Sequence, residues 1–382
     1  MSEFLRRASA ELQLNESEMR LFARAAIRNF DALADLLALS PSLSRELARH
    51  GIRREALLRR LEGLVSPAYR EARDAPFVPP PQVPGAAEPA PSPPRPGAPI
   101  LQPPRWPGIG LVPGLADDAE VPLPESLLDW PVRNQQLRPT CVGFAVASAL
   151  ERGRGAPAAE KLSAMFVYQR ALARRRETLA PEAFAAEAGG TRLGDAAEVL
   201  AQEGICGEAL WEDDVPLEAE PPPPILAAAA PNRVPRSFHW DIPFGTPRPP
   251  NVARVVLDLL VDRGVVVIAL PVFKDPDAPE GLTNWSSPRA RRHGIVPDPL
   301  LPPWQKVAGH AVCVLGFQPD AAEARGGWFI FRNSVGADWA SGAPNRLSLD
   351  LPQVPARGWG AISASHVEGF CWEIWAPPRP PG

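Results

Sequence analysis

The segment that most constrains the fold runs from Val132 to Leu150 and has the sequence VRNQQLRPTCVGFAVASAL. A polar loop leads through Cys141 into small and apolar residues, a pattern typical of a buried helix. The cysteine then lies at the helix N-terminus, where unpaired backbone N–H groups and the helix dipole stabilise an anion. We therefore expect the Cys141 thiol to ionise more easily than a free cysteine, whose pKa is about 8.5.

Three motifs with residues suited to acyl-transfer chemistry follow one another along the chain. The first contains Asn134-Gln135, Cys141 and Gly143-Phe144-Ala145. The second contains Gly309-His310-Ala311-Val312 and Leu315-Gly316-Phe317. The third runs from Phe329 to Ser334 and is followed by Gly336 and Trp339. The order Gln, Cys, His, Asn resembles that of the papain-like cysteine peptidases, here in an intracellular, bacterial-type form. The resemblance extends from near Val121, where Leu123 to Ser126 resembles the start of a mature domain, to near Pro377.

The resemblance implies an α+β fold with two lobes, one helical and one built from an antiparallel sheet or barrel. It places Cys141 opposite His310 across a cleft between the lobes. It further implies that Cys141 is the nucleophile, that His310 acts as general base and acid, and that Asn333 orients the imidazole. Gln135 would donate a hydrogen bond to the oxyanion of the tetrahedral intermediate. The implied reaction is amide hydrolysis through a thioester, with no metal and no cofactor.

Three other residues are candidates for substrate binding. Gly189-Gly190 resembles the glycine pair that lines the family's cleft, where backbone without Cβ atoms can approach a peptide and pair with it as an added strand. The alternative for this pair is a flexible loop. The resemblance places Trp339 near the leaving-group side of the cleft, although a tryptophan after a glycine turn also suits a core.

The sequence departs from the family pattern near the site. Val335 stands where a tryptophan commonly shields the asparagine–histidine hydrogen bond, so we expect a looser and wetter contact between Asn333 and His310, with modest activity. Arg138 stands where many members have a cysteine. His310 and Asn333 also follow Cys141 at more than the about 130–150 residues usual for the family, which loop insertions can accommodate.

Composition excludes several other classes of protein. A net charge of -4, with acidic and basic residues intermixed, gives no electrostatic basis for binding nucleic acid or an anionic membrane. The cysteines, at 141, 206, 313 and 371, form neither a CxxC nor a Cys/His ligand pattern, so we expect neither zinc nor a disulfide framework. The N-terminus lacks the apolar core of a signal peptide. We therefore expect a cytoplasmic protein in a reducing environment.

Three regions are expected along the chain. Residues 1–74 are predicted to form a small helical bundle, with a capping box at Asn15 and Glu18 and a further helix start at Ser40-Pro41. Residues 75–120 are a proline-rich linker, and residues 121–382 form the peptidase-like domain. The bundle is either a permanent adaptor that recruits a partner or substrate, or a removable prosegment. The adaptor is favoured because Arg24 falls where the family's propeptides have an aromatic residue.

Periodicity within the large domain predicts its helices and strands. Helices are expected at 141–154, 163–176, 193–203 and 251–263, and strands at 265–272, 310–317, 328–333 and 369–375. Two proline-rich interruptions, 215–250 and 274–303, are expected to be surface loops.

These observations favour a cysteine endopeptidase that acts on proteins or peptides. Acyl or peptide transfer at the same cysteine is a second hypothesis, because an acyl-enzyme can react with an amine as well as with water. A third is a binding protein in which the helical bundle acts and the peptidase-like domain is a scaffold. The complete set of Gln135, Cys141, His310 and Asn333 disfavours the scaffold.

Overall fold

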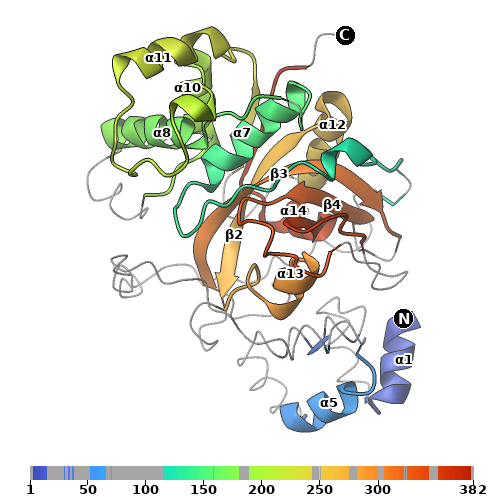
Figure 1. Cartoon of the computed structure of the whole chain (residues 1–382). Coiled ribbons are helices and arrows are strands. Elements are labelled where there is room, and N and C mark those ends of the chain that lie inside the picture. The colour runs from blue at the N-terminus through green and yellow to red at the C-terminus, as the bar shows by residue number, and fades with distance from the viewer. Residues whose placement is uncertain are drawn as a thin grey trace.

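The computed structural model describes two parts of the chain that differ in architecture (Figure 1). A small helical part lies near the N-terminus, and a larger part with helices and a sheet follows from residue 115. The α+β prediction is therefore confirmed. The described residues are 3–14, 30, 33–34, 37, 52–65, 70, 115–116, 118–157, 159–179, 189–242, 249, 251–274, 282–298, 305–321, 323, 325–343 and 352–379.

A six-stranded antiparallel sheet forms the centre of the larger part, with strand order β1-β6-β2-β3-β4-β5. The pairs β2–β3, β3–β4 and β4–β5 join strands that follow one another in the sequence, whereas β6 pairs with β1 and β2, which come much earlier. The bounds are β1 Phe238–Asp241, β2 Val266–Lys274, β3 Gln305–Pro319, β4 Gly327–Arg332, β5 Trp359–Ser363 and β6 Glu373–Ala376.

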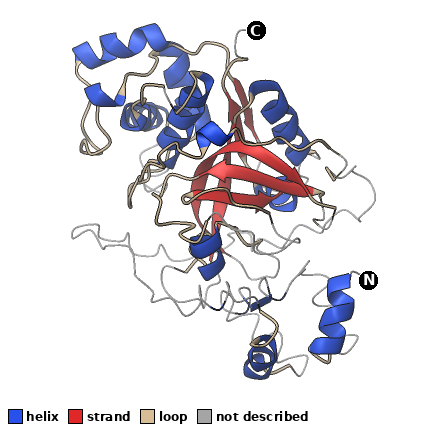
Figure 2. Ribbon diagram, turned by 45° about the vertical axis from the view of Figure 1, so that its right-hand side comes forward, coloured by secondary structure: helices blue, strands red, loops and turns tan. Residues whose placement is uncertain are grey.

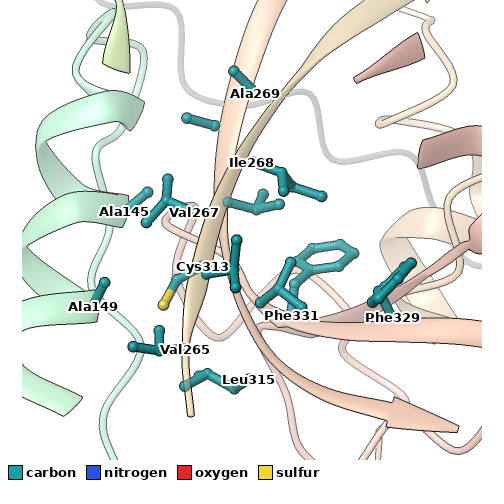
Figure 3. Packing of buried hydrophobic residues seen from close by; sticks show 14 of the residues in the cluster. Ala145, Ala149, Val265, Val267, Ile268, Ala269, Cys313, Leu315, Phe329 and Phe331 are labelled. Carbon is teal, nitrogen blue, oxygen red and sulfur yellow. The ribbon is translucent and has the colours of Figure 1, made fainter. Parts of the chain in front are cut away.

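Side chains of the central strands are buried on both faces of the sheet. Figure 3 shows Ala145 and Ala149 of a neighbouring helix facing Val267 and Cys313 on one side of β2, with Ile268 on the other. Successive strand residues point to opposite faces, so a strand covered on both sides needs apolar residues at every position. This explains why β2 has a continuous run of aliphatic residues in place of an alternating pattern.

Helices cover both faces of this sheet (Figures 1 and 2). The helical lobe contains α7 Cys141–Gly153, α8 Ala164–Thr178, α10 Leu193–Gln202 and α11 Pro223–Ala229, and α7 packs against β2 and β3. The helices α12 Val252–Arg263 and α14 Ala364–Phe370 pack against each other and against β2, and α13 spans Pro288–His293. None of the helices in the described ranges has the length and apolar character needed to cross a membrane.

Two glutamates from the C-terminal segment hold the start of two of these helices. Glu373 on β6 accepts hydrogen bonds from Leu193 N and Gly194 N, at 3.3 and 3.2 Å, where α10 begins. Glu368 on α14 accepts from Asn251 N and Ala253 N, both at 2.9 Å, where α12 begins. A carboxylate at a helix N-terminus satisfies N–H groups that have no partner within the helix and interacts favourably with the dipole. The last residues of the fold therefore fix helices that are distant in sequence.

The expected helices and strands are present, with ends that differ by a few residues. The sequence patterns missed β5 and α14. The prediction that residues 215–250 form only a surface loop is wrong, because this range contains α11 and β1. The same holds for residues 274–303, which contain α13. Both helices have proline in their first turn, where the missing N–H would have no helical partner in any case.

The N-terminal part contains α1 Glu3–Glu11 and α5 Arg54–Leu61. Buried residues of these helices and of the neighbouring segments form one apolar cluster, which also includes Phe273 of the larger part and has Leu282 and Phe370 at its edge. Its N-terminal members are Ala8, Leu12, Leu14, Phe30, Leu33, Ala34, Leu37, Ile52, Leu57, Leu61 and Val65. The helical part thus packs against the end of β2. The predicted capping box at Asn15 and Glu18, the helix start at Ser40-Pro41 and most of the 75–120 linker lie outside the described residues.

Removing the Glu373 carboxylate should weaken the attachment of α10. In Glu373→Ala two buried N–H groups lose their charged acceptor, and we expect the free energy of unfolding to fall by about 2–3 kcal/mol. Chemical denaturation of the purified protein measures this difference. Glu373→Gln keeps one acceptor oxygen, so its free energy of unfolding should fall by less than that of the alanine variant. Equal stability of all three proteins would show that the carboxylate does not hold the helix.

Candidate active site

Cys141 is the first residue of α7, as the sequence predicts, and its side chain is partly buried. Gly143 allows this helix to lie directly against α8, because a Cβ atom built on Gly143 would come within 2.3 Å of Ala164 O. Any larger residue there would push the first turn of α7, and with it the cysteine, away from the helical lobe.

His310 and Asn333 lie on neighbouring strands of the sheet. His310 is on β3, and Asn333 directly follows the last residue of β4, which pairs with β3 through Cys313 and Arg332. This pairing brings His310 Nε2 to 2.8 Å from Asn333 Oδ1. The amide oxygen can only accept, so Nε2 carries the proton and Nδ1 is left with a lone pair.

The thiol of Cys141 lies next to the strand that carries the histidine. Burial raises the pKa of Cys141 from its ordinary value of 9.0 and outweighs hydrogen bonds from the backbone N–H groups of Ala311 and Val142, which lower it. The expectation of an easily ionised thiol is therefore wrong, because the burial of the thiol has a larger effect on its pKa than the backbone N–H groups that favour the thiolate. The Ala311 contact places the sulfur beside the residue that follows His310.

The imidazole of His310 is shifted in the opposite direction. Burial lowers the pKa of His310 from its ordinary value of 6.5, and the hydrogen bond to Asn333 partly offsets this by favouring the protonated ring. Both groups therefore favour their neutral forms at rest, a thiol and an imidazole. Transfer of the proton from sulfur to nitrogen leaves the pair with no net charge, so the buried environment opposes this step less than it opposes a lone charge.

Gln135 is joined to Asn333 through Ser334. Gln135 N donates to Ser334 O at 2.7 Å, and Ser334 Oγ donates to Gln135 Oε1 at 2.5 Å. Ser334 N in turn donates to Asn333 Oδ1 at 2.8 Å. The Gln135 side-chain nitrogen donates one hydrogen to Arg138 O at 2.8 Å and has a second for another acceptor. The motif from Phe329 to Ser334 includes this serine, but the sequence alone predicts no role for it.

Arginines anchor the loop that carries Gln135. The guanidinium of Arg138 donates to Asp213 O and Val215 O. It thereby joins the loop of Gln135 to the loop of residues 213–215, at the position where many papain-like enzymes have a cysteine. Arg133 donates to both carboxylate oxygens of Asp213, at 3.1 and 2.6 Å, and to Leu162 O at 2.8 Å. All four cysteines are free thiols. Ionic and polar contacts therefore fix this loop.

The structure corrects the expectation of a loose and wet contact between His310 and Asn333. The hydrogen bond is 2.8 Å long, and Asn333 is only 3% exposed. The indole of Trp285 lies against His310, with ring centroids 4.7 Å apart and an interplanar angle of 76°. Trp285 comes from the proline-rich range that we predicted to be a surface loop, which is why the sequence patterns missed it. A tryptophan within such a range is the signal that could have identified it.

The candidate substrate-binding residues occupy two different places. Gly189 has a φ of +76°, its carbonyl accepts a hydrogen bond from Tyr168 Oη at 3.0 Å, and an added Cβ would lie 3.6 Å from Pro139, in the loop before the cysteine. Gly190 follows it and is partly exposed. Trp339 is 8% exposed, and its Nε1 donates to Trp285 O at 3.1 Å. Contact of these residues with substrate stays a prediction.

Neither the protein-family models nor the curated proteins include a match to this sequence. Solved structures similar to this chain are cysteine proteases. Xylellain, from Xylella fastidiosa, is 15% identical, covers 70% of this chain and 94% of its own, and has a TM-score of 0.44. The protease CMS1MS2 from Carica candamarcensis, in complex with E-64, is 15% identical over 66% and 93% of the two chains, with a TM-score of 0.40.

Bromelain from Ananas comosus, in complex with the E64 inhibitor, is also 15% identical and covers 65% of this chain and 93% of its own, with a TM-score of 0.39. These proteins are of the class that the sequence motifs resemble. Because the identities and TM-scores are low, the function proposed below rests on the side chains of the site.

The opposite pKa shifts of Cys141 and His310 predict how the thiol reacts with iodoacetamide. Since the Cys141 pKa is raised above 9.0 and the imidazole is neutral at pH 7, the thiolate should accumulate only as the pH rises past 9.0. The alkylation rate of Cys141, followed by intact mass, should therefore keep rising above pH 9. A rate that is already constant from mildly acidic pH would show that the thiolate–imidazolium pair is the resting state. His310→Ala provides the control without the imidazole.

Proposed function

We propose that this protein is a cysteine endopeptidase that hydrolyses peptide bonds through a thioester acyl-enzyme. The observation that carries the proposal is the 2.8 Å hydrogen bond between His310 Nε2 and Asn333 Oδ1, next to the strand residue whose N–H contacts the Cys141 thiol. This arrangement leaves His310 Nδ1 free to accept the thiol proton. It combines a nucleophile, a base and a group that orients the base.

The first half of the reaction forms the acyl-enzyme. His310 Nδ1 takes the proton of Cys141 while the sulfur attacks the peptide carbonyl carbon, which forms a C–S bond and an oxyanion. Gln135 Nε2 and the Cys141 backbone N–H donate to that oxyanion. When the intermediate collapses, His310 gives its proton to the amide nitrogen, the C–N bond breaks and the amine leaves. The acyl group remains on sulfur as a thioester.

The second half regenerates the enzyme with the same residues. His310 accepts a proton from water as the water oxygen attacks the thioester carbonyl, and Gln135 again donates to the oxyanion. The C–S bond then breaks, the acid product leaves, and the proton on His310 returns to the thiolate. Asn333 serves throughout, because its oxygen accepts from Nε2 in both the neutral and the charged ring.

The neighbouring backbone supports a peptide as the substrate. Gly189 lies beside the loop that precedes the cysteine and presents backbone without a Cβ atom. We propose that an extended peptide lies along Gly189-Gly190, with Trp339 toward the leaving-group side. The N-terminal helical bundle is proposed to stay attached and to recruit a protein partner or substrate. Free thiols at all four cysteines support a reducing, cytoplasmic location.

Peptidase assays on the full-length chain test this function. Cys141→Ala should abolish cleavage of an unfolded protein or a mixed peptide library, because it removes the proposed nucleophile. Gln135→Ala should lower kcat by about 10²–10³ through loss of an oxyanion donor. Cys206→Ala is the matched control, since Cys206 is a fully buried free thiol outside the site and should leave cleavage unchanged.

Retained cleavage in Cys141→Ala would refute the peptidase assignment. The same assay with an added amine separates hydrolysis from transfer. Faster capture of the acyl group by the amine than by water would identify a transferase, whereas free acid as the main product supports hydrolysis.

A further inference from the structure

The segment between β2 and α13 delivers a buried aromatic side chain to the candidate histidine. Trp285 is only 8% exposed, and its ring stands nearly perpendicular to that of His310, 4.7 Å away. Perpendicular packing at this distance is a favoured geometry for aromatic pairs. The indole therefore restricts the rotation of the imidazole and covers one side of it.

Several elements hold Trp285 in this orientation. Its Nε1 donates to Pro271 O of β2 at 3.4 Å, and its own carbonyl accepts from Trp339 Nε1 at 3.1 Å. Its ring also lies 5.7 Å from that of Phe331 on β4. The indole is thus supported from β2, from β4 and from the turn that follows Asn333.

The residue before Trp285 fastens the segment to the sheet. Asn284 is fully buried, its N donates to Phe273 O at 3.0 Å, and its Oδ1 accepts from Phe273 N at 2.9 Å. Two hydrogen bonds to one strand residue mimic the pairing of a further strand. Ser287 then caps α13 by accepting from Ala290 N at 3.0 Å. Trp285 is consequently part of a rigid segment and not of an adaptable loop.

We propose that Trp285 is a positioning residue for His310 and limits access of water to its hydrogen bond with Asn333. The proposal rests on the function proposed above. Val335, two residues after the asparagine, is only partly buried and offers a small side chain, whereas the indole presents a large apolar surface to the imidazole. By fixing the ring, Trp285 keeps Nε2 on Asn333 and Nδ1 available for Cys141. It also contributes to the burial that lowers the pKa of His310.

Kinetics of Trp285→Ala and Trp285→Phe test the role. A misplaced catalytic group can cost about 10² in rate, and we expect Trp285→Ala to approach this loss in kcat while KM changes less than about twofold. Opening the site to water should raise the His310 pKa toward 6.5, so the acid limb of the pH profile of kcat should move to higher pH. Trp285→Phe keeps a ring against His310, so its kcat and the acid limb of its pH profile should stay close to those of the parent.

Trp328→Ala is the matched control, because that indole lies at the opposite end of β4 from Asn333 and bonds to Asp320. It should leave kcat and the acid limb unchanged. Circular dichroism shows whether each variant is folded, and Trp285→Leu, which also removes the ring, takes the place of the alanine variant if that variant is not.

The proposal is overturned if the folded variant without the ring, Trp285→Ala or Trp285→Leu, keeps the parent kcat and acid limb, or if its whole effect lies in KM. Failure of the proposed function gives a different result, namely cleavage that survives in Cys141→Ala. The two failures are therefore distinguishable.

Discussion

The hydrogen bond between His310 and Asn333 is the interaction on which the site depends. It exists because β3 and β4 pair in a register that places Asn333, directly after the end of β4, near His310 in the interior of β3. Asn333 Oδ1 also accepts from Ser334 N, and Ser334 holds the loop of Gln135. One amide oxygen thus connects His310 to the loop that carries Gln135, the proposed oxyanion donor. A shift in the register of β4 would displace all of these groups together.

The rest of the fold keeps the helical lobe against this sheet. Glu373 on β6 holds the start of α10, and Arg133 ties the loop before Cys141 to the carboxylate of Asp213. These contacts are buried or partly buried, where a charged hydrogen bond is stronger than at an exposed surface. The apolar cluster of the N-terminal part includes Phe273, the strand residue that also forms two hydrogen bonds with Asn284. Phe273 therefore connects the N-terminal cluster to the segment that carries Trp285.

Sequence patterns predicted much of this arrangement because its elements are long and strongly periodic. The helix after Cys141 and the strand before Asn333 have apolar residues at nearly every position, as expected for elements buried on all sides. Patterns failed where a contact distant in sequence decides the outcome. Burial of the Cys141 thiol depends on the opposite lobe, and its pKa is raised where the helix N-terminus alone predicts a lower value. Trp285 was missed because prolines around it suggested an exposed loop, whereas proline here begins a helix.

The measurement that tests the central claim most directly is labelling of the full-length protein with a thiol-directed peptidyl epoxide, followed by intact mass. Cys141→Ala and His310→Ala are run beside the parent chain. A cysteine peptidase with a permanent N-terminal module should take up one inhibitor per uncleaved chain, and both variants should take up none. Labelling that survives in either variant, or that never occurs in the parent, would contradict a catalytic pair of Cys141 and His310.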